Sequence, residues 1–333
     1  MACRMLESFD TFTTLTERWD FLSGGNTQVL AAAARTGIAG LRSGDHYIQK
    51  NLTAQGTWVT GFAYRTSNVL DAVSLFRDVD GATVQGALQQ NALSQFEVLR
   101  GATVVATSTL LITLNVFYYL EFKHIIANAG GTLEMRVNGA VWATFTGDTQ
   151  QTANPTADRV ALGPAAVVEG ATRDFDDFYL YDGTGAINND YAGDSQIERM
   201  LPTGAGTYTE FTNLVGAATH WQAVNEVPPN GDTSYAEATV LNQRDTFALG
   251  NVTPTSATIP AIQMSMRIRK TAAGALNAAR MYRSTAGVDN QGADIALSTS
   301  YVSILEVLEL EPVGAVAWTV ADVNGMEAGA RAR

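Results

Sequence analysis

The sequence predicts an all-β protein of two modules, and its composition, length and residue patterning lead to that prediction. Only 16% of the 333 residues are charged, whereas 46% are hydrophobic and 30 are glycine. Such a chain has enough apolar residues for cores and enough turn residues for many short strands. Its length exceeds that of one ordinary domain, which holds ~100 to 200 residues. Apolar residues also recur at every second position in several segments, as expected for strands.

The first strand signals lie in two segments of the N-terminal half. Residues 58–65, WVTGFAYR, alternate aromatic residues with small or polar ones. Residues 74–88 place Asp80-Gly81 between two β-rich runs. This dipeptide tolerates the positive φ of a two-residue turn, so we expect a hairpin there.

The clearest hairpin signal covers residues 132–145. Leu133, Met135 and Val137 alternate with charged residues, and Asn138-Gly139 then turns the chain into a returning strand. Further strands are expected at residues 159–163 and 174–185. The first module is therefore predicted to be antiparallel throughout.

The periodic pattern dissolves between residues 184 and 213, where Gly, Asn and Thr dominate and only 196–201 is a possible strand. We place the domain boundary there, which gives modules 1–213 and 214–333. The second module is predicted as a smaller β-sandwich with a short helix starting at Thr319 or Ala321. Its strand candidates are residues 246–250, 259–270, 276–284 and 300–310.

Charge and cysteine content exclude several function classes. A net charge of −12 opposes binding to nucleic acid, which requires clustered basic residues. One cysteine, Cys3, rules out an intrachain disulfide. We also expect no signal peptide and no membrane insertion, because the longest apolar stretch, 103–120, is interrupted by Thr, Ser and Asn.

Familiar catalytic patterns are missing from the sequence. The three histidines, His46, His124 and His220, lie in no motif for nucleophilic catalysis or zinc binding, and we expect them to have packing or surface roles. Glycoside hydrolysis requires two carboxylates across a groove. The nearest candidates, Glu309 and Glu311, alternate with apolar residues as on any exposed strand. From this we predict that the chain is not an enzyme.

Calcium is the one cofactor for which the sequence offers ligands. Asp174, Asp176 and Asp177 lie together in DFDDF, and strand alternation would put the first two on one side and Asp177 on the other. One such pair with backbone carbonyls is able to hold calcium. The alternative is that these carboxylates are solvated groups at turns and edges, and then no cofactor is bound.

Sugar binding without catalysis uses exposed aromatic rings with polar neighbours. The residues we consider for this role are Trp142, Tyr179, Tyr181 and Tyr191. The alternative for each is packing in the core or in a hairpin.

Residues 7 to about 210 resemble the concanavalin-A-like, laminin-G-like sandwich domains of phage structural proteins. The resemblance lies in ESFDTF, GTWVTGFAYR, SLFRDVDG, YYLEFKHIIANAGGTLEMRVNGA, RVALG and DFDDFYLYDGTGAINNDYAGD. It implies a jelly roll of two antiparallel sheets, a place in the outer parts of a virion and glycan recognition. The acidic strand motif of related glucanases is absent.

From these observations we expect a non-enzymatic structural component of a tailed bacteriophage virion, such as a decoration, collar or tail-associated protein. It would be assembled in the host cytoplasm and would act by self-assembly and docking to other virion proteins as a homo-oligomer. The alternative is a carbohydrate-binding adhesin that contacts glycans of the host surface. A glycan-cleaving enzyme is the third hypothesis.

Overall fold

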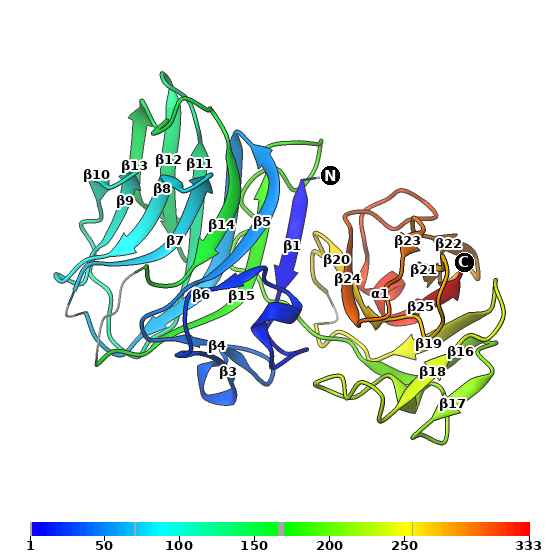
Figure 1. The fold of residues 1–333 in the computed structure, drawn as a ribbon. Helices are drawn as coiled ribbons and strands as arrows, with labels where there is room; N and C mark the ends of the chain where they lie inside the picture. Colours follow the sequence, from blue (N-terminus) through cyan, green and yellow to red (C-terminus); the bar gives the residue numbers. More distant parts are fainter. Residues whose placement is uncertain (1, 70, 166–169, 255) are drawn as a thin grey trace. The chain divides into compact units, whose positions relative to one another are not determined.

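The computed structural model describes residues 2–69, 71–165, 170–254 and 256–333. Antiparallel strands dominate it, which confirms the predicted all-β class (Figure 1). The chain divides into two compact units, Met1–Ile197 and Glu198–Arg333. This division lies before the boundary expected near 213, because Pro202–Thr209 forms strand β16, which pairs with β19 of unit 2.

Unit 1 contains two antiparallel sheets. The first, sheet A, has the strand order β13-β12-β11-β6-β15-β4-β3, with β1 also paired to β15. Its strands are β1 (Cys3–Glu7), β3 (Thr27–Leu30), β4 (Gly40–Ser43), β6 (Thr57–Thr66), β11 (Tyr118–Ile125), β12 (Gly131–Val137), β13 (Ala140–Gly147) and β15 (Arg173–Asp182).

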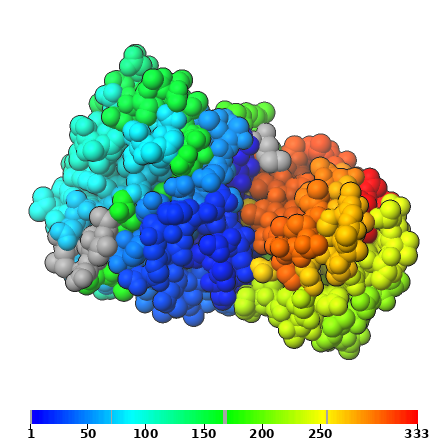
Figure 2. All heavy atoms as spheres, viewed as in Figure 1, coloured from blue at the N-terminus to red at the C-terminus, as the bar shows by residue number. Residues whose placement is uncertain are grey.

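The second, sheet B, has the order β10-β9-β8-β7-β14-β5-β2. Its strands are β2 (Phe21–Leu22), β5 (Ile48–Gln55), β7 (Val73–Asp80), β8 (Thr83–Gln90), β9 (Phe96–Arg100), β10 (Thr103–Thr107) and β14 (Ala157–Leu162). Two 3-10 turns, η1 (Leu15–Glu17) and η2 (Ala31–Ala33), lie in the connections. In the space-filling view, green β14 lies between cyan β7 and blue β5 on the surface (Figure 2).

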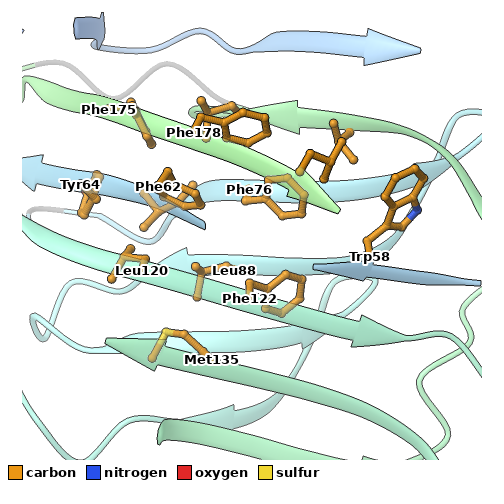
Figure 3. Packing of buried hydrophobic residues seen from close by; sticks show 14 of the residues in the cluster. Trp58, Phe62, Tyr64, Phe76, Leu88, Leu120, Phe122, Met135, Phe175 and Phe178 are labelled. Atoms are coloured by element: carbon orange, nitrogen blue, oxygen red, sulfur yellow. The ribbon is translucent and has the colours of Figure 1, made fainter. Parts of the chain in front are cut away.

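The sheets stack into a sandwich because each turns one apolar face toward the other. Phe62 of β6 and Phe122 of β11 meet Phe76 of β7 between the sheets, with ring centroids 6.4 and 5.9 Å from that of Phe76 (Figure 3). Trp58 and Leu88 are also fully buried in this layer. The sandwich predicted for the N-terminal part is therefore present.

Both predicted hairpins form where their turn residues allow them. Asn138 and Gly139 have φ of 49° and 81° between β12 and β13, as a two-residue turn with two positive φ angles requires. Gly81, with φ of 59°, follows β7 and leads into β8.

Unit 2 has a smaller core around Tyr282, Trp318 and Val323. Its main sheet has the order β16-β19-β25-β21-β22, with β23 also paired to β21, and two strand pairs, β17-β18 and β20-β24, lie outside it. The strands are β16 (Pro202–Thr209), β17 (Asn213–Val215), β18 (Tyr235–Glu237), β19 (Arg244–Leu249), β20 (Ile262–Ile268), β21 (Asn277–Arg283), β22 (Asp289–Gln291), β23 (Ile295–Ala296), β24 (Val302–Leu308) and β25 (Glu327–Ala332).

The helix expected near the C-terminus is α1 (Val320–Gly325), and a 3-10 turn, η3 (Trp221–Ala223), lies earlier in the unit. Thr319 caps α1: its hydroxyl accepts from Asp322 N, and the Asp322 carboxylate accepts from Thr319 N. Residues 196–201, considered as a strand, form none. In the parts of the chain that the structure describes, no helix has the length and apolar character to cross a membrane.

Candidate functional site

The outer face of sheet A carries charged and aromatic side chains on its central strands. In β11, Leu120 and Phe122 belong to the core, so Tyr119, Glu121 and Lys123 point to the other side. Two other strands of the sheet, β12 next to β11 and β15 on the far side of β6, add further residues to the same face: Glu134, Arg136, Asp174, Tyr179 and Tyr181. This face therefore combines carboxylates, cations and tyrosine rings.

Residues 190–197, which we call the strap, lie across this face without forming a helix or strand. The Lys123 ammonium donates to Asp190 Oδ1 over 3.0 Å, and Gly193 N donates to Glu121 Oε1 over 2.7 Å. The Tyr191 ring lies 3.8 Å from the Arg136 guanidinium carbon and 5.6 Å from Lys123 Nζ. The strap therefore contacts side chains of both β11 and β12.

Arg35, in the loop before β4, holds the other end of the strap. Its guanidinium donates to Asp194 Oδ1 over 2.5 Å and to the carbonyl of Ser195 over 3.2 Å. The same side chain pairs with Asp177 at 3.4 Å and lies 5.2 Å from the centre of the Tyr119 ring. One cation thus links the strap, β11 and β15.

Three tyrosines form a row beneath the strap. The rings of Tyr119 and Tyr179 are 6.5 Å apart and nearly parallel, and Tyr181 follows 4.5 Å from Tyr179. Tyr179 donates its hydroxyl proton to Glu121 Oε1 over 2.6 Å and accepts from Ala192 N over 3.1 Å. Burial, followed by the nearby Glu121 carboxylate, raises the pKa of Tyr179 well above its ordinary value, so this hydroxyl stays protonated as a donor.

Strand β15 is interrupted by a bulge at Asp176 and Asp177, where its pairing with β6 shifts register. Asp177 has a φ of 50°, a strained value for a residue with a side chain. The bulge brings both carboxylates to residues 35 and 36: Asp176 accepts from both backbone amides, and Asp177 accepts from the Thr36 hydroxyl over 2.9 Å. Strand alternation predicted that Asp176 and Asp177 point to opposite sides of the strand. The bulge explains why both instead contact residues 35 and 36.

The two aspartates of the bulge are fully buried, and their acidity changes accordingly. Burial, and then repulsion from Asp177, raises the pKa of Asp176 to about 7. Burial also raises the pKa of Asp177, against the hydrogen bond from Ile197 N of the strap. A carboxyl group with a pKa near neutrality is able to gain or lose a proton at physiological pH.

Asp174 lies on the same face in a separate ion-pair cluster. Arg42 donates to its Oδ1 over 2.7 Å, and Arg65 donates to its Oδ2 over 2.6 Å. Both guanidinium groups also donate to the carbonyl of Ala32. The carboxylate of Asp174 is thus occupied by two cations.

The calcium prediction named Asp174, Asp176 and Asp177. Their carboxylates accept hydrogen bonds from arginines and backbone amides, so their oxygens already have partners. Within residues 2–69, 71–165, 170–254 and 256–333, no three side chains of His, Cys, Asp or Glu gather in a way that would suit a metal ion.

The four aromatic residues predicted to bind sugar lie in two places. Tyr179 and Tyr181 are buried, at 1% and 2% exposure, and the half-buried Tyr191 lies in the strap above the same face. Trp142 packs elsewhere, against the core rings of Phe96 and Tyr118 at 6.0 and 6.2 Å.

The sequence did not single out Tyr119, Glu121, Lys123, Arg136 and Arg35 as site residues. For the three residues of β11, a usable signal existed, because they alternate with the apolar residues of one strand. Arg136 shares that signal, because it alternates with Met135 and Val137 in β12. Arg35 had none, since its role depends on contacts with the strap, which has no periodic pattern.

Each histidine lies beside an aspartate. His124 is fully buried inside the sandwich, where Nδ1 is 2.9 Å from Asp78 Oδ2 and Nε2 is 3.1 Å from the carbonyl oxygen of Thr149. The carbonyl only accepts, so Nε2 is protonated. In unit 2, His220 Nδ1 is 2.5 Å from Asp245 Oδ2.

No family model matches the chain, and neither does any curated protein. Solved structures similar to it include the cellulose-induced protein Cip1, with a TM-score of 0.42 and 16% identity over 53% of this chain and 96% of that chain. An alginate lyase, Aly36B, has a TM-score of 0.40 and 10% identity over 54% and 97%. A carbohydrate esterase of the Shiga toxin-encoding bacteriophage phi24B has a TM-score of 0.39 and 12% identity over 53% and 98%.

These findings correct one conclusion of the sequence analysis. The prediction that the chain is not an enzyme is wrong, because the similar structures include alginate lyases and a carbohydrate esterase. The exclusion had relied on missing motifs, and motifs of other folds need not occur in a sandwich. What the strand pairing and the core establish for unit 1 is a β-sandwich.

Proposed function

We propose that unit 1 binds carbohydrate on the outer face of sheet A. The observation that supports this most directly is the row of Tyr119, Tyr179 and Tyr181 beside the buried carboxylate of Glu121. Aromatic rings cover the apolar faces of pyranoses, and carboxylates accept the hydroxyl protons of sugars.

The rim of this face supports the same function. Lys123 and Arg136 are partly exposed, at 21% and 33%, and Arg136 also pairs with Glu134 at 2.8 Å. Such donors and acceptors fix the orientation of a sugar whose ring lies on an aromatic surface. The proposed site therefore combines a buried aromatic floor with a charged edge.

A glycan array probed with the purified full-length chain tests this function. We expect the substitution Arg136→Ala to weaken binding by about tenfold, the effect of a lost charge-assisted hydrogen bond. Arg159→Ala is the matched control, because Arg159 lies on sheet B, is 30% exposed and pairs with Asp158 at 3.0 Å. Mass spectrometry of each bound glycan then separates binding from cleavage or removal of a substituent.

Binding that both substitutions weaken equally would argue against the outer face of sheet A. A chain that binds none of the glycans, in either its original or its Arg136→Ala form, would remove the proposed function altogether.

We further propose that the protein is a surface component of a bacteriophage particle, where carbohydrate binding would attach the particle to its host. The support for this location is the resemblance of residues 7 to about 210 to sandwich domains of phage structural proteins. Mass spectrometry of purified particles, with electron microscopy of the isolated protein, tests it. The expected result is the chain in stoichiometric amounts as a symmetric homo-oligomer beside other virion proteins, and its absence from the particles would refute this location.

A further inference from the structure

We infer that the strap, residues 190–197, occupies the carbohydrate site as an internal ligand, and that the site takes a carboxylated glycan which displaces it. The inference rests on the proposed function, because it names the ligand class and the regulation of the same site. Three properties of the strap support it: the charges it presents, the ring it presents, and the way it is held.

The strap presents two carboxylates to two separate cations of the face. Asp190 contacts Lys123 at 3.0 Å, and Asp194 contacts Arg35 at 2.5 Å. Neither cation belongs to the strap, and they come from β11 and from the loop before β4. A chain of acidic sugars offers the same pattern, with carboxylates at intervals along an extended polymer.

Between these carboxylates, the strap places a six-membered ring on the face. The Tyr191 ring lies 3.8 Å from the Arg136 guanidinium carbon, and its hydroxyl donates to the carbonyl of Glu134 over 3.3 Å. A flat ring bearing a hydroxyl has the approximate size of a pyranose. The same position next to Arg136 and Lys123 suits a sugar ring with a carboxylate substituent.

The strap is also held in a way that allows release. It belongs to no sheet, so it leaves without breaking the backbone pairing of a strand. Its ion pairs lie at the surface, with Asp190 at 64% and Asp194 at 47% exposure, and such pairs contribute little net stability. Its other contacts include hydrogen bonds from the amides of Ala192, Gly193 and Ile197 to buried acceptors.

Displacement would uncover hydrogen-bonding groups that the strap now satisfies. Gly193 N donates to Glu121, and Ala192 N donates to the hydroxyl oxygen of Tyr179. Both acceptors are buried while the strap is in place, and each loses one donor when the strap leaves. Sugar hydroxyl groups are donors of the right kind to replace the two amides.

The experiment uses the full-length chain and a strap variant, Asp190→Asn with Asp194→Asn. The probes are oligosaccharides containing uronate or sialate, each with its methyl ester as the uncharged partner. We expect the strap variant to bind the charged probes about five- to tenfold more tightly than the original chain, because its internal competitor has lost two ion pairs. The methyl esters should bind at least tenfold more weakly than the acids.

The control variant carries Asp148→Asn and Asp232→Asn. These aspartates form comparable surface pairs, with Arg100 at 2.9 Å and Arg269 at 2.7 Å, and are 37% and 62% exposed. Its affinities should equal those of the original chain. Hydrogen exchange followed by mass spectrometry supplies a second readout: the amides of Gly193 and Ile197 should exchange faster when the charged probe is bound.

The outcomes separate this inference from the proposed function. Equal binding of acids and methyl esters overturns the carboxylated ligand, while carbohydrate binding stands. Tight binding of the acids with unchanged affinity in the strap variant and unchanged exchange of the strap overturns displacement. Binding of neutral glycans alone overturns the inference, and binding of no glycan by either form overturns the proposed function as well.

Discussion

The two sheets of unit 1 share one core but differ on their outer faces. The outer face of sheet B carries neutral residues such as Ala87, Gln89 and Ala161, together with one largely buried cation, Arg77. The outer face of sheet A carries carboxylates that are almost fully buried, among them Glu121 and Asp174. A sandwich needs one apolar face on each sheet, and buried charges on the other face cost free energy unless each is paired. The difference between the two faces is therefore one of degree, and we connect the paired carboxylates of sheet A with its proposed binding role.

The largest expected effect comes from the paired charges of sheet A. Asp174→Ala leaves Arg42 and Arg65 without their common partner, and we expect unit 1 to lose about 3 kcal/mol of unfolding free energy. Asp158→Ala on sheet B removes an ion pair whose carboxylate is 37% exposed, and should cost at most about 1 kcal/mol. Urea denaturation of both variants measures the difference. Similar losses of unfolding free energy in the two variants would mean that the ion pairs of the two faces contribute equally to stability.

A second contrast is between this doubly paired carboxylate and one that is only partly hydrogen-bonded. Glu7 at the end of β1 is buried, its Oε2 has no hydrogen-bond partner, and burial raises its pKa to about 7. Between pH 4.5 and about 7, the folded protein therefore holds a proton on Glu7 that the unfolded chain releases. The stability that this proton contributes is complete below the ordinary pKa of 4.5 and is lost as the pH rises through about 7.

Glu7→Gln tests that statement, because glutamine keeps the shape of the protonated group without its titration. We expect the variant and the original chain to be equally stable at pH 4, and the variant to be more stable at pH 8 by about 3 kcal/mol, the equivalent of the raised pKa. Urea denaturation at both pH values gives the comparison. A variant that is less stable at pH 8 would mean that the charged carboxylate is well accommodated.

A smaller effect is expected from one hydroxyl of the aromatic row. Tyr179→Phe leaves the ring in place but removes the donor to Glu121 and the acceptor for Ala192 N, which should cost about 1 to 2 kcal/mol. Tyr118→Phe, which removes only an acceptor for Thr113 N near the surface, should cost less. Thermal unfolding ranks the two, and glycan binding should fall only in Tyr179→Phe. The reverse ranking would show that the Tyr179–Glu121 bond contributes nothing.

The features that could be predicted from sequence are those that depend on local chemistry. Asn138-Gly139 specifies its hairpin because both residues accept positive φ, and the alternation of residues 58–65 specifies β6 because one face is apolar. Tyr179 and Tyr181 were chosen because their strand was recognised. All of these depend on residues within a few positions of one another.

The rest of the site depends on contacts between distant residues. The φ of 50° at Asp177 occurs at a residue that gives no glycine signal, and the strap contacts positions as far back as Arg35. Because the strap has no periodic pattern, the sequence predicts a linker for this segment. For the same reason, it predicts that the basic residues beneath the strap are solvated. Only the folded chain brings these groups together.

The smallest expected effect on stability comes from one exposed ion pair on each sheet. Comparing the two pairs separates effects on stability from effects on binding. Lys123 on sheet A and Arg100 on sheet B each pair with an exposed aspartate, Asp190 and Asp148, at 3.0 and 2.9 Å. Lys123→Ala and Arg100→Ala should therefore both change stability by no more than about 1 kcal/mol. Isothermal titration with a bound glycan should nevertheless distinguish them, since only Lys123 lies at the proposed site. If the two variants also bind equally, the charged rim of sheet A is an ordinary surface, and the reason for its composition lies in folding alone.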